Sequence, residues 1–115
     1  IDESIEKLIF QKADSITSHI PVDFYHPNRL KIIEGDFLKP YNETELELLS
    51  RSKLKPVYCR DGSIYAFLVE SFKKSGSILG YKQGYIINSA EEHLNIDTMR
   101  DWYLAEILMS KEKIN

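Results

Sequence analysis

The sequence is poor in cysteine, in basic residues and in long apolar runs. Cys59 is its only cysteine, so no disulfide can form within the chain, and this favours a reducing, cytoplasmic compartment. There are 15 basic residues against 18 acidic ones, a net charge of −3, with no basic block, so we expect no sequence-independent binding to nucleic acid. The longest uninterrupted apolar run, Ile64 to Val69, is far too short to span a bilayer, so we expect no membrane insertion.

Glycine and histidine are also scarce, which argues against two further kinds of site. The chain has five glycines, and none of them forms GxGxxG or GxxxxGK, the turns that cradle the phosphates of a nucleotide. His19, His26 and His93 are scattered and lack the short spacing of zinc ligands. The sequence therefore predicts neither a phosphate cradle nor a zinc site.

What the chain does contain is typical of one small α/β domain over residues 1–115. Its 115 residues are 43% hydrophobic and 29% charged. Helical spacing predicts a helix over 2–12 with Ile5, Leu8 and Ile9 on its buried face. Alternation predicts a strand over 15–20 that ends at Pro21. A turn at 34–36 predicts a hairpin between the extended segments around it, and 40–56 is expected to be an irregular arm.

The second half of the chain continues the alternation of strands and helices. Asp61-Gly62 between two apolar runs predicts a tight hairpin turn, with strands over 57–59 and 64–69. A short helix over 70–74 should end at Gly76, and 81–87 should form a strand. This alternation predicts a layered sheet with helices.

The stretch from Asn95 to Trp102 carries the strongest local signal. Thr98 and Asp101 have the spacing of a capping box, and the apolar residues that follow should face a core. These apolar residues are Met99, Trp102, Tyr103, Leu104, Ile107 and Leu108. In an extended segment, Asn95 and Asp97 would point to the same side, an arrangement of oxygen ligands that suits Mg²⁺. The alternative is that Asp97 only helps to start the helix.

Four short motifs occur in order over almost the whole chain. They are His26-Pro27-x-Arg29, Arg51-x-x-Leu54-x-Pro56, Asp61-Gly62-Ser63-Ile64-Tyr65, and Asn95-Ile96-Asp97-Thr98 followed by Ala105-Glu106. This ordered set resembles the acylneuraminate cytidylyltransferases, also called CMP-sialic acid synthetases. The resemblance covers the C-terminal half of that family. Nothing in the chain is similar to the A-R-x-G-S-K type loop that holds CTP in the family's N-terminal half.

The resemblance implies a fold and a reaction. The fold would be part of a nucleotide-diphospho-sugar-transferase-like, Rossmann-like layered sheet that lacks the nucleotide-binding half. The reaction would be nucleotidyl transfer, in which a sialic-acid-like nonulosonic acid attacks CTP with Mg²⁺ as cofactor, forming a CMP-sugar and releasing pyrophosphate. Residues 1–115 would supply the sugar-acid-binding and dimerisation half, inactive by themselves, of a cytoplasmic homodimer.

The resemblance also implies roles for individual residues. Asp97 would bind the metal or activate the sugar hydroxyl, and Asn95 stands where the family has an aspartate. Arg29 and Arg51 would reach the sugar acid across a dimer interface. Asp61, where an asparagine is usual, and Tyr65 would contact the sugar. Many members of the family have an arginine at the position of Cys59, and Arg60 is the candidate to take its role. Ile78 and Leu79 stand where some members have aromatic residues that line the sugar pocket.

These departures from the family pattern leave the substrate and the class of function open. Legionaminic, pseudaminic and related acids are alternatives to N-acetylneuraminate. A non-catalytic interaction module that keeps the fold and the dimer surface, within the arm from Phe24 to Leu54, is a second possibility. A related sugar-acid cytidylyltransferase such as CMP-Kdo synthetase is a more distant third.

Overall fold

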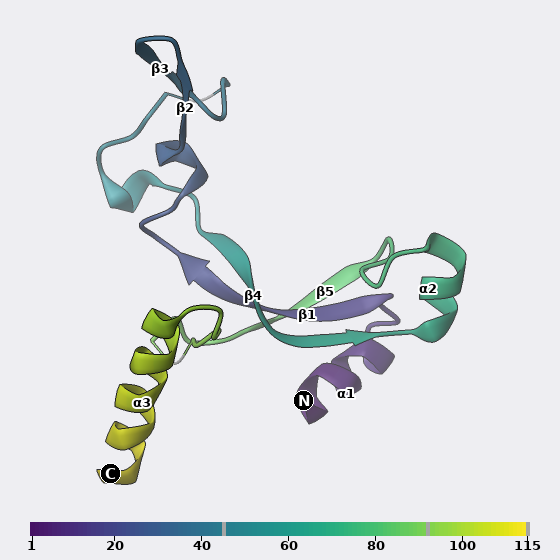
Figure 1. The fold of residues 1–115 in the computed structure, drawn as a ribbon. Coiled ribbons are helices and arrows are strands. Elements are labelled where there is room, and N and C mark those ends of the chain that lie inside the picture. The colour runs from purple at the N-terminus through teal and green to yellow at the C-terminus, as the bar shows by residue number, and fades with distance from the viewer. Residues whose placement is uncertain (45, 92, 115) are drawn as a thin grey trace. The chain divides into compact units, whose positions relative to one another are not determined.

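The computed structural model describes residues 1–44, 46–91 and 93–114 (Figure 1). The chain folds as two compact units, which we call the sheet unit (Ile1–Ile20 with Arg60–Asn115) and the hairpin unit (Pro21–Cys59). No helix in the described part of the chain is long and apolar enough to cross a membrane.

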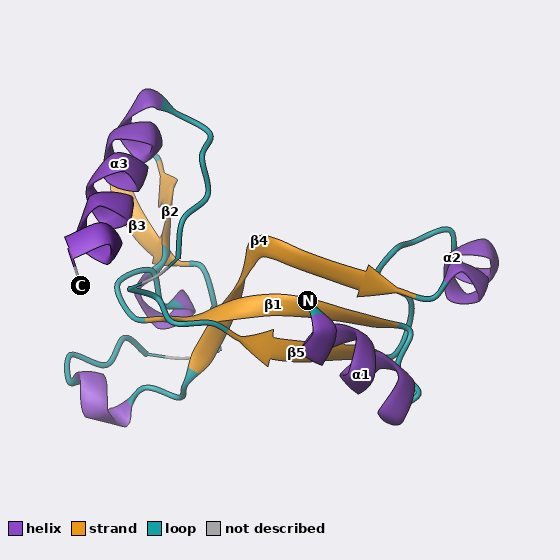
Figure 2. Cartoon of the chain, turned by 90° about the horizontal axis from the view of Figure 1, so that it is seen from below, coloured by secondary structure: helices purple, strands orange, loops and turns teal. Residues whose placement is uncertain are grey.

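The sheet unit is built on a three-stranded sheet in the order β4-β1-β5 (Figure 2). Strand β1 (Ser15–Val22) pairs in parallel with β5 (Gln83–Ile87), from Ser15 opposite Gln83 to His19 opposite Ile87. Strand β4 (Val57–Phe67) runs antiparallel to β1. Two hydrogen bonds show this: Leu68 N donates to Asp14 O, and Ile64 N donates to Ser18 Oγ. The sheet is therefore mixed, and the α/β class is confirmed.

Helix α1 (Asp2–Phe10) confirms the first predicted helix, but not its buried face. Leu8 is buried with Ala13, Ile16 and Ile86 in the apolar core of the sheet unit. Ile5 and Ile9, predicted to share the buried face, are 46% and 69% exposed. Two features hold the helix beside β5, the hydrogen bond from Lys7 to the Tyr85 carbonyl and the position of the Lys7 ammonium over the Tyr85 ring. In this placement only one apolar side chain of the helix reaches the core.

Strand β1 runs past the proline that was expected to end it. Pro21 lies beyond the pairing with β5, which ends at His19, so its missing N–H removes no hydrogen bond to that strand. Strand β5 is shorter than the predicted 81–87. The backbone N–H groups of Tyr81 and Lys82 donate instead to the Asp14 carboxylate, each at 2.8 Å. Helix α2 (Val69–Ser75) ends, as predicted, at Gly76, whose φ is +72°.

The predicted hairpin at Asp61-Gly62 is wrong. Strand β4 continues through both residues, and Gly62 has φ +79° within the strand. The Asp61 side chain accepts from Ser63 N, as in a turn, but it also accepts from Ser18 on the neighbouring strand. These contacts with the sheet outweigh the tendency of Asp-Gly to reverse the chain. The dipeptide therefore distorts β4 locally, and the strand continues beyond it.

The hairpin unit contains the predicted hairpin of β2 (Lys31–Glu34) and β3 (Phe37–Pro40). Glu34 lies opposite Phe37, and Gly35 takes the positive φ of +60° that the tight turn requires. The arm after β3 is irregular, as expected, apart from a short 3-10 turn at Arg51–Lys53. The Asn28 amide fixes the arm by donating to Leu46 O and accepting from Leu48 N.

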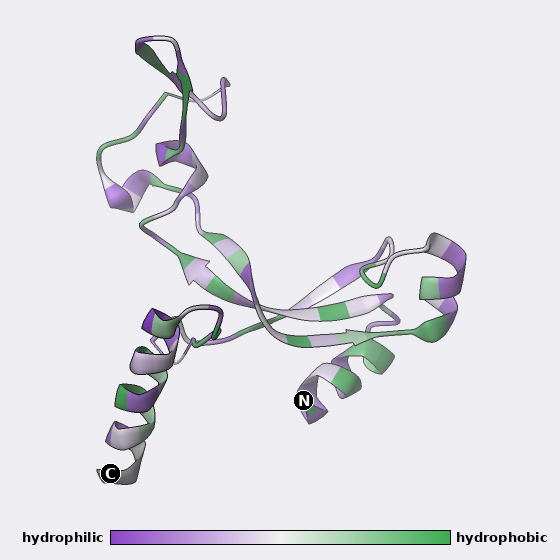
Figure 3. Cartoon of the chain, in the orientation of Figure 1, coloured by the Kyte–Doolittle hydropathy of each residue, from purple (hydrophilic) through white to green (hydrophobic). Residues whose placement is uncertain are grey.

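Helix α3 (Met99–Ile114) confirms the predicted helix and its capping box. Asp101 accepts from Thr98 N at 3.0 Å, and Asp101 N donates to Thr98 Oγ1 at 3.3 Å. Figure 3 shows the hydropathy of the residues along the chain. The prediction that the apolar residues of α3 face a core is wrong. Five of them are between 46% and 61% exposed, namely Met99, Trp102, Tyr103, Leu104 and Ile107. Leu108, by contrast, is half-buried. Helical spacing indicates which side chains share a face, but it cannot show whether a neighbouring element covers that face.

Candidate functional site

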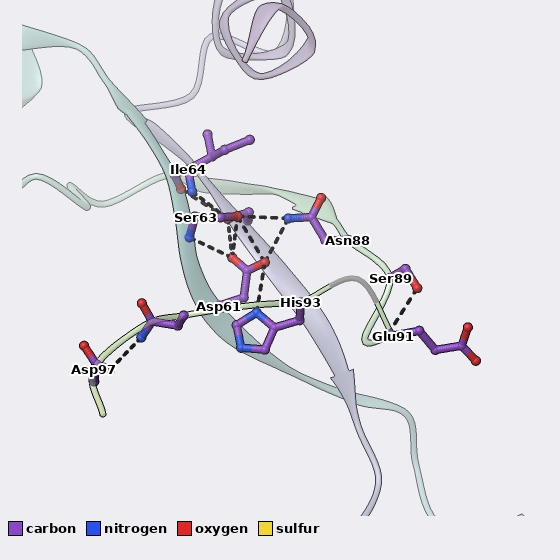
Figure 4. A network of polar contacts seen from close by, with 10 residues as sticks. Asp61, Ser63, Ile64, Asn88, Ser89, Glu91, His93 and Asp97 are labelled. Carbon is purple, nitrogen blue, oxygen red and sulfur yellow. Dashed lines mark hydrogen bonds and ion pairs between the residues drawn. The ribbon is translucent and has the colours of Figure 1, made fainter. Parts of the chain in front are cut away.

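The carboxylate of Asp61 is the centre of a polar network in the sheet unit (Figure 4). Its Oδ1 accepts from Ser18 Oγ on β1 and from the backbone N–H and hydroxyl of Ser63, at 3.1 and 3.0 Å. Its Oδ2 accepts from Asn88 Nδ2 at 2.8 Å and lies 3.1 Å from Ser63 Oγ. The side chain is 1% exposed, so a carboxylate is held inside the fold by three neighbouring residues.

Two opposing effects set the pKa of Asp61. Burial raises the pKa, because it disfavours the charged form. The hydrogen bonds from Ser18, Asn88 and Ser63 stabilise that form, and together they outweigh burial and hold the pKa well below its ordinary value. Asp61 is therefore ionised at neutral pH.

A cavity of about 160 Å³ opens beside this carboxylate. It is lined by Asp61, Ser63, Asn88, Ser89, His93 and Leu94. The His93 imidazole is turned toward Asp61, with its Nδ1 3.9 Å from Oδ2 (Figure 4). A negative oxygen, hydroxyls, an amide and an imidazole can together bind a small neutral group that carries hydroxyl or amide functions.

Two other predicted sugar contacts lie close together on β4. The Arg60 guanidinium carbon is 5.6 Å from the centre of the Tyr65 ring, and both residues are exposed. A guanidinium held over an aromatic ring remains suited to binding a carboxylate. Asp61 and Tyr65 of the motif, and Arg60 beside it, thus lie in the single strand β4, where the sequence predicted a hairpin turn.

The predicted metal pair, Asn95 and Asp97, lies in the segment between β5 and α3. Asn95 Nδ2 donates to Asp97 Oδ2 at 2.8 Å, and both side chains are exposed. The helix is capped by Thr98 and Asp101: the Asp101 carboxylate accepts from the N–H groups of Asp97 and Thr98, and Thr98 Oγ1 accepts from Asp101 N. Among the described residues there is no group of three or more His, Cys, Asp or Glu side chains that could hold a metal. The pair can offer one carboxylate, which fits an ion whose remaining ligands are water and phosphate.

The two predicted residues that precede β5 do not join this group. Ile78 and Leu79 lie in the loop before β5, where Leu79 O accepts from Ser15 Oγ at 2.7 Å. Ser15 is the first residue of β1 and Ser18, which contacts Asp61, is the fourth, so the loop meets the strand about 10 Å from Asp61's contact. In the hairpin unit, Arg29 is half-buried, and Arg51 forms an exposed ion pair with Asp23 at 3.0 Å.

Sequence reasoning missed four members of the network, namely Ser18, Ser63, Asn88 and His93. One signal could have found Asn88 and Ser89. They follow a strand that pairs in parallel, and ligands of α/β sheets bind outside the carboxyl ends of parallel strands. Ser18 and His93 gave no such signal, because their roles depend on strand pairing and on the path of a loop.

A scan against models of protein families finds no match to this chain, and neither does a search of curated proteins.

Proposed function

We propose that this chain supplies the sugar-acid-binding half of a nucleotidyltransferase that forms a CMP-sugar from CTP and a nonulosonic acid. The fold would be the corresponding part of a Rossmann-like, nucleotide-diphospho-sugar-transferase-like sheet. The observation that carries the proposal is the ionised Asp61 carboxylate at the wall of a small polar cavity, within the motif that resembles the sugar contacts of acylneuraminate cytidylyltransferases. The segment that leaves this cavity carries Asn95 and Asp97, the residues of the motif for metal binding.

In this proposal the charge of each residue determines which part of the substrates it contacts. Asp61 accepts hydrogen bonds from neutral groups of the sugar, because its own charge repels the sugar's carboxylate. Arg60 binds that carboxylate, and Tyr65 supplies the ring against which Arg60 lies. Asp97, with Asn95 beside it, holds Mg²⁺, which neutralises the phosphates of CTP when bound. Catalysis then depends mainly on how these groups position the sugar hydroxyl.

Binding of the sugar acid tests the proposal directly on the 115-residue chain. We expect a nonulosonic acid such as N-acetylneuraminate, legionaminate or pseudaminate to shift the amide NMR signals of Asp61, Tyr65 and Asn88. The Arg60→Gln variant should bind at least tenfold more weakly, because it loses a charge-assisted contact with the carboxylate. Lys39→Gln in the hairpin unit is the matched control for loss of one positive charge. Wild-type signals that stay unshifted with all three acids would contradict the proposal.

A second candidate function is a non-catalytic interaction module. Two observations favour it, because Asp61 already accepts hydrogen bonds from three residues of its own chain and the Asn95 amide is directed at Asp97. This candidate predicts association without sugar binding. CMP-Kdo synthetase activity is a third candidate. Titration of the chain with the eight-carbon acid Kdo, under the same conditions, tests it.

The hairpin unit is proposed as a surface for self-association. Its arm exposes Leu46 and Leu49 at 89% and 92%, and β2 and β3 expose Ile33 and Phe37 at 75% and 80%. Leu54, at the end of the arm, is half-buried. Burying such apolar side chains in a two-fold interface would remove them from water.

We therefore expect the chain to be a dimer in solution and the Leu46→Ser, Leu49→Ser double variant to dissociate at least tenfold more readily. Sedimentation equilibrium measures both constants. Leu104→Ser, an exposed leucine of α3 in the sheet unit, is the control. A wild-type chain that stays monomeric at millimolar concentration would exclude this interface.

A further inference from the structure

The hairpin unit contains a cavity that the proposed function does not use. Its volume is about 570 Å³, which is within the range of sites that bind small molecules. Its described lining residues lie between His26 and Val57, so the cavity belongs to the hairpin unit alone. It therefore shares no residue with the site around Asp61, which lies in the sheet unit.

Two buried polar residues hold the walls of this cavity together. His26 Nδ1 accepts from Asn28 N at 3.0 Å, and His26 Nε2 lies 2.8 Å from Lys55 O. The Asn28 amide donates to Leu46 O at 3.1 Å and accepts from Leu48 N at 2.8 Å. These contacts join three segments of the chain that line the cavity. Because the contacts lie within the chain, they fix the walls by themselves, and a ligand need not order them.

The lining of the cavity combines apolar side chains with positive charge. Leu48, Leu54 and Val57 provide apolar surface, and the last two are half-buried. Lys53 and Lys55 are the charged members, and no described residue of the lining is acidic. A ligand that matches both parts has an anionic group attached to a hydrocarbon body.

The two lysines have no acidic partner in the described part of the chain. Lys31 and Lys39 of the same unit form ion pairs with glutamates, at 3.1 and 2.7 Å. No described acidic side chain pairs in this way with Lys53 or Lys55. Both are exposed, so an anion that binds to them gains the modest attraction of a surface ion pair.

We propose that this cavity binds a small amphiphilic anion. The hydrocarbon body of the ligand lies against Leu48, Leu54 and Val57, and its anionic group lies at Lys53 and Lys55. The apolar part supplies most of the affinity, because each buried methylene contributes a factor of roughly three to four. The lysines select for negative charge. This site does not rest on the proposed function, because all of its residues belong to the hairpin unit.

The experiment titrates the 115-residue chain with octanoate and follows its amide NMR signals. The protein concentration is one at which sedimentation equilibrium finds a monomer, so that self-association does not cover the cavity. We expect saturable shifts for the lining residues Thr44, Leu48, Lys53 and Val57, and unchanged signals in the sheet unit. From butanoate to hexanoate to octanoate, the dissociation constant should fall roughly three- to fourfold for each added methylene.

Charge is tested with a second ligand and with two double variants. Octylammonium has the chain of octanoate with the opposite charge, and it should bind at least tenfold more weakly. The Lys53→Gln, Lys55→Gln variant should bind octanoate roughly fivefold more weakly, because it loses two surface charges. Lys73→Gln, Lys74→Gln is the matched control, since it removes two exposed lysines of α2 in the sheet unit, and it should bind as wild type does.

Four results would overturn the proposal. Octanoate that shifts none of the cavity signals at millimolar concentration would exclude the site. Shifts that extend equally over the exposed apolar residues of α3 would mean that octanoate adsorbs without a site. Octylammonium that binds as tightly as octanoate, or an equal loss of affinity in the two double variants, would exclude the role of Lys53 and Lys55.

Discussion

Asp61→Ala is expected to lower the free energy of unfolding by about 1–3 kcal/mol, the cost of leaving the buried donor Ser18 without its acceptor. Ser18, Ser63 and Asn88 would all lose an acceptor in this variant. Asp61→Asn keeps the shape and one acceptor oxygen, so its loss should be smaller. Urea unfolding monitored by circular dichroism gives both values, and Asp36→Ala at the exposed turn of the hairpin unit is the control.

The same carboxylate should make stability depend on acidity. Its pKa in the folded state lies below the ordinary value of 3.8, so its contribution is present above about pH 4 and is lost as the pH falls further. We expect the unfolding free energy of wild type to fall more steeply below pH 4 than that of Asp61→Asn. The pKa values of Asp14 and Asp101 are also lowered, through backbone hydrogen bonds from Lys82 and from Asp97 respectively. Both aspartates are present in wild type and in Asp61→Asn, so they do not contribute to the difference between the two proteins. Parallel pH profiles for the two proteins would rule out an ionised, hydrogen-bonded Asp61.

Asp97→Asn is expected to reduce CMP-sugar formation by orders of magnitude in the protein made from its complete reading frame, with the fold unchanged. The substitution keeps size and hydrogen bonding but removes the only carboxylate of the Asn95–Asp97 pair. Thr98 and Asp101 start the helix with contacts of their own, so α3 should form equally well in the variant. Product formation and the far-UV spectrum together measure the two effects.

Asn95→Asp is the companion variant. A second carboxylate beside Asp97 should hold or raise the affinity for Mg²⁺, because the ion then gains a charged ligand. A fully active, normally folded Asp97→Asn protein would mean that the metal role is wrong.

Local chemistry was sufficient to predict the elements whose ends are set by nearby residues. Gly76 ends α2, Gly35 forms the turn of the hairpin, and Thr98 with Asp101 begins α3. Each depends on the conformation or hydrogen bonding of a few neighbouring residues, which the sequence contains directly.

The predictions were wrong where residues far away in the sequence determine the local structure. Asp61-Gly62 has the composition of a turn, but Ser18 and Asn88, far away in sequence, hold Asp61 inside a continuous strand. Exposure of Trp102 and Ile107 on α3 likewise depends on which elements pack nearby. The candidate site shows the same division. The resemblance pointed to Asp61, Arg60 and Tyr65, whereas strand pairing and the path of a loop bring Ser18 and His93 to Asp61.

The most direct measurement of the central claim is detection of the product. The protein made from its complete reading frame is incubated with CTP, Mg²⁺ and each nonulosonic acid in turn, and the mixture is analysed by mass spectrometry for the CMP-sugar and by a coupled assay for pyrophosphate. We predict both products with at least one acid, and neither from the 115-residue chain alone, which has no glycine-rich phosphate cradle. A folded protein that makes no CMP-sugar from any of the acids would contradict the proposed function, and pyrophosphate release by the 115-residue chain alone would contradict its assignment as the sugar-binding half.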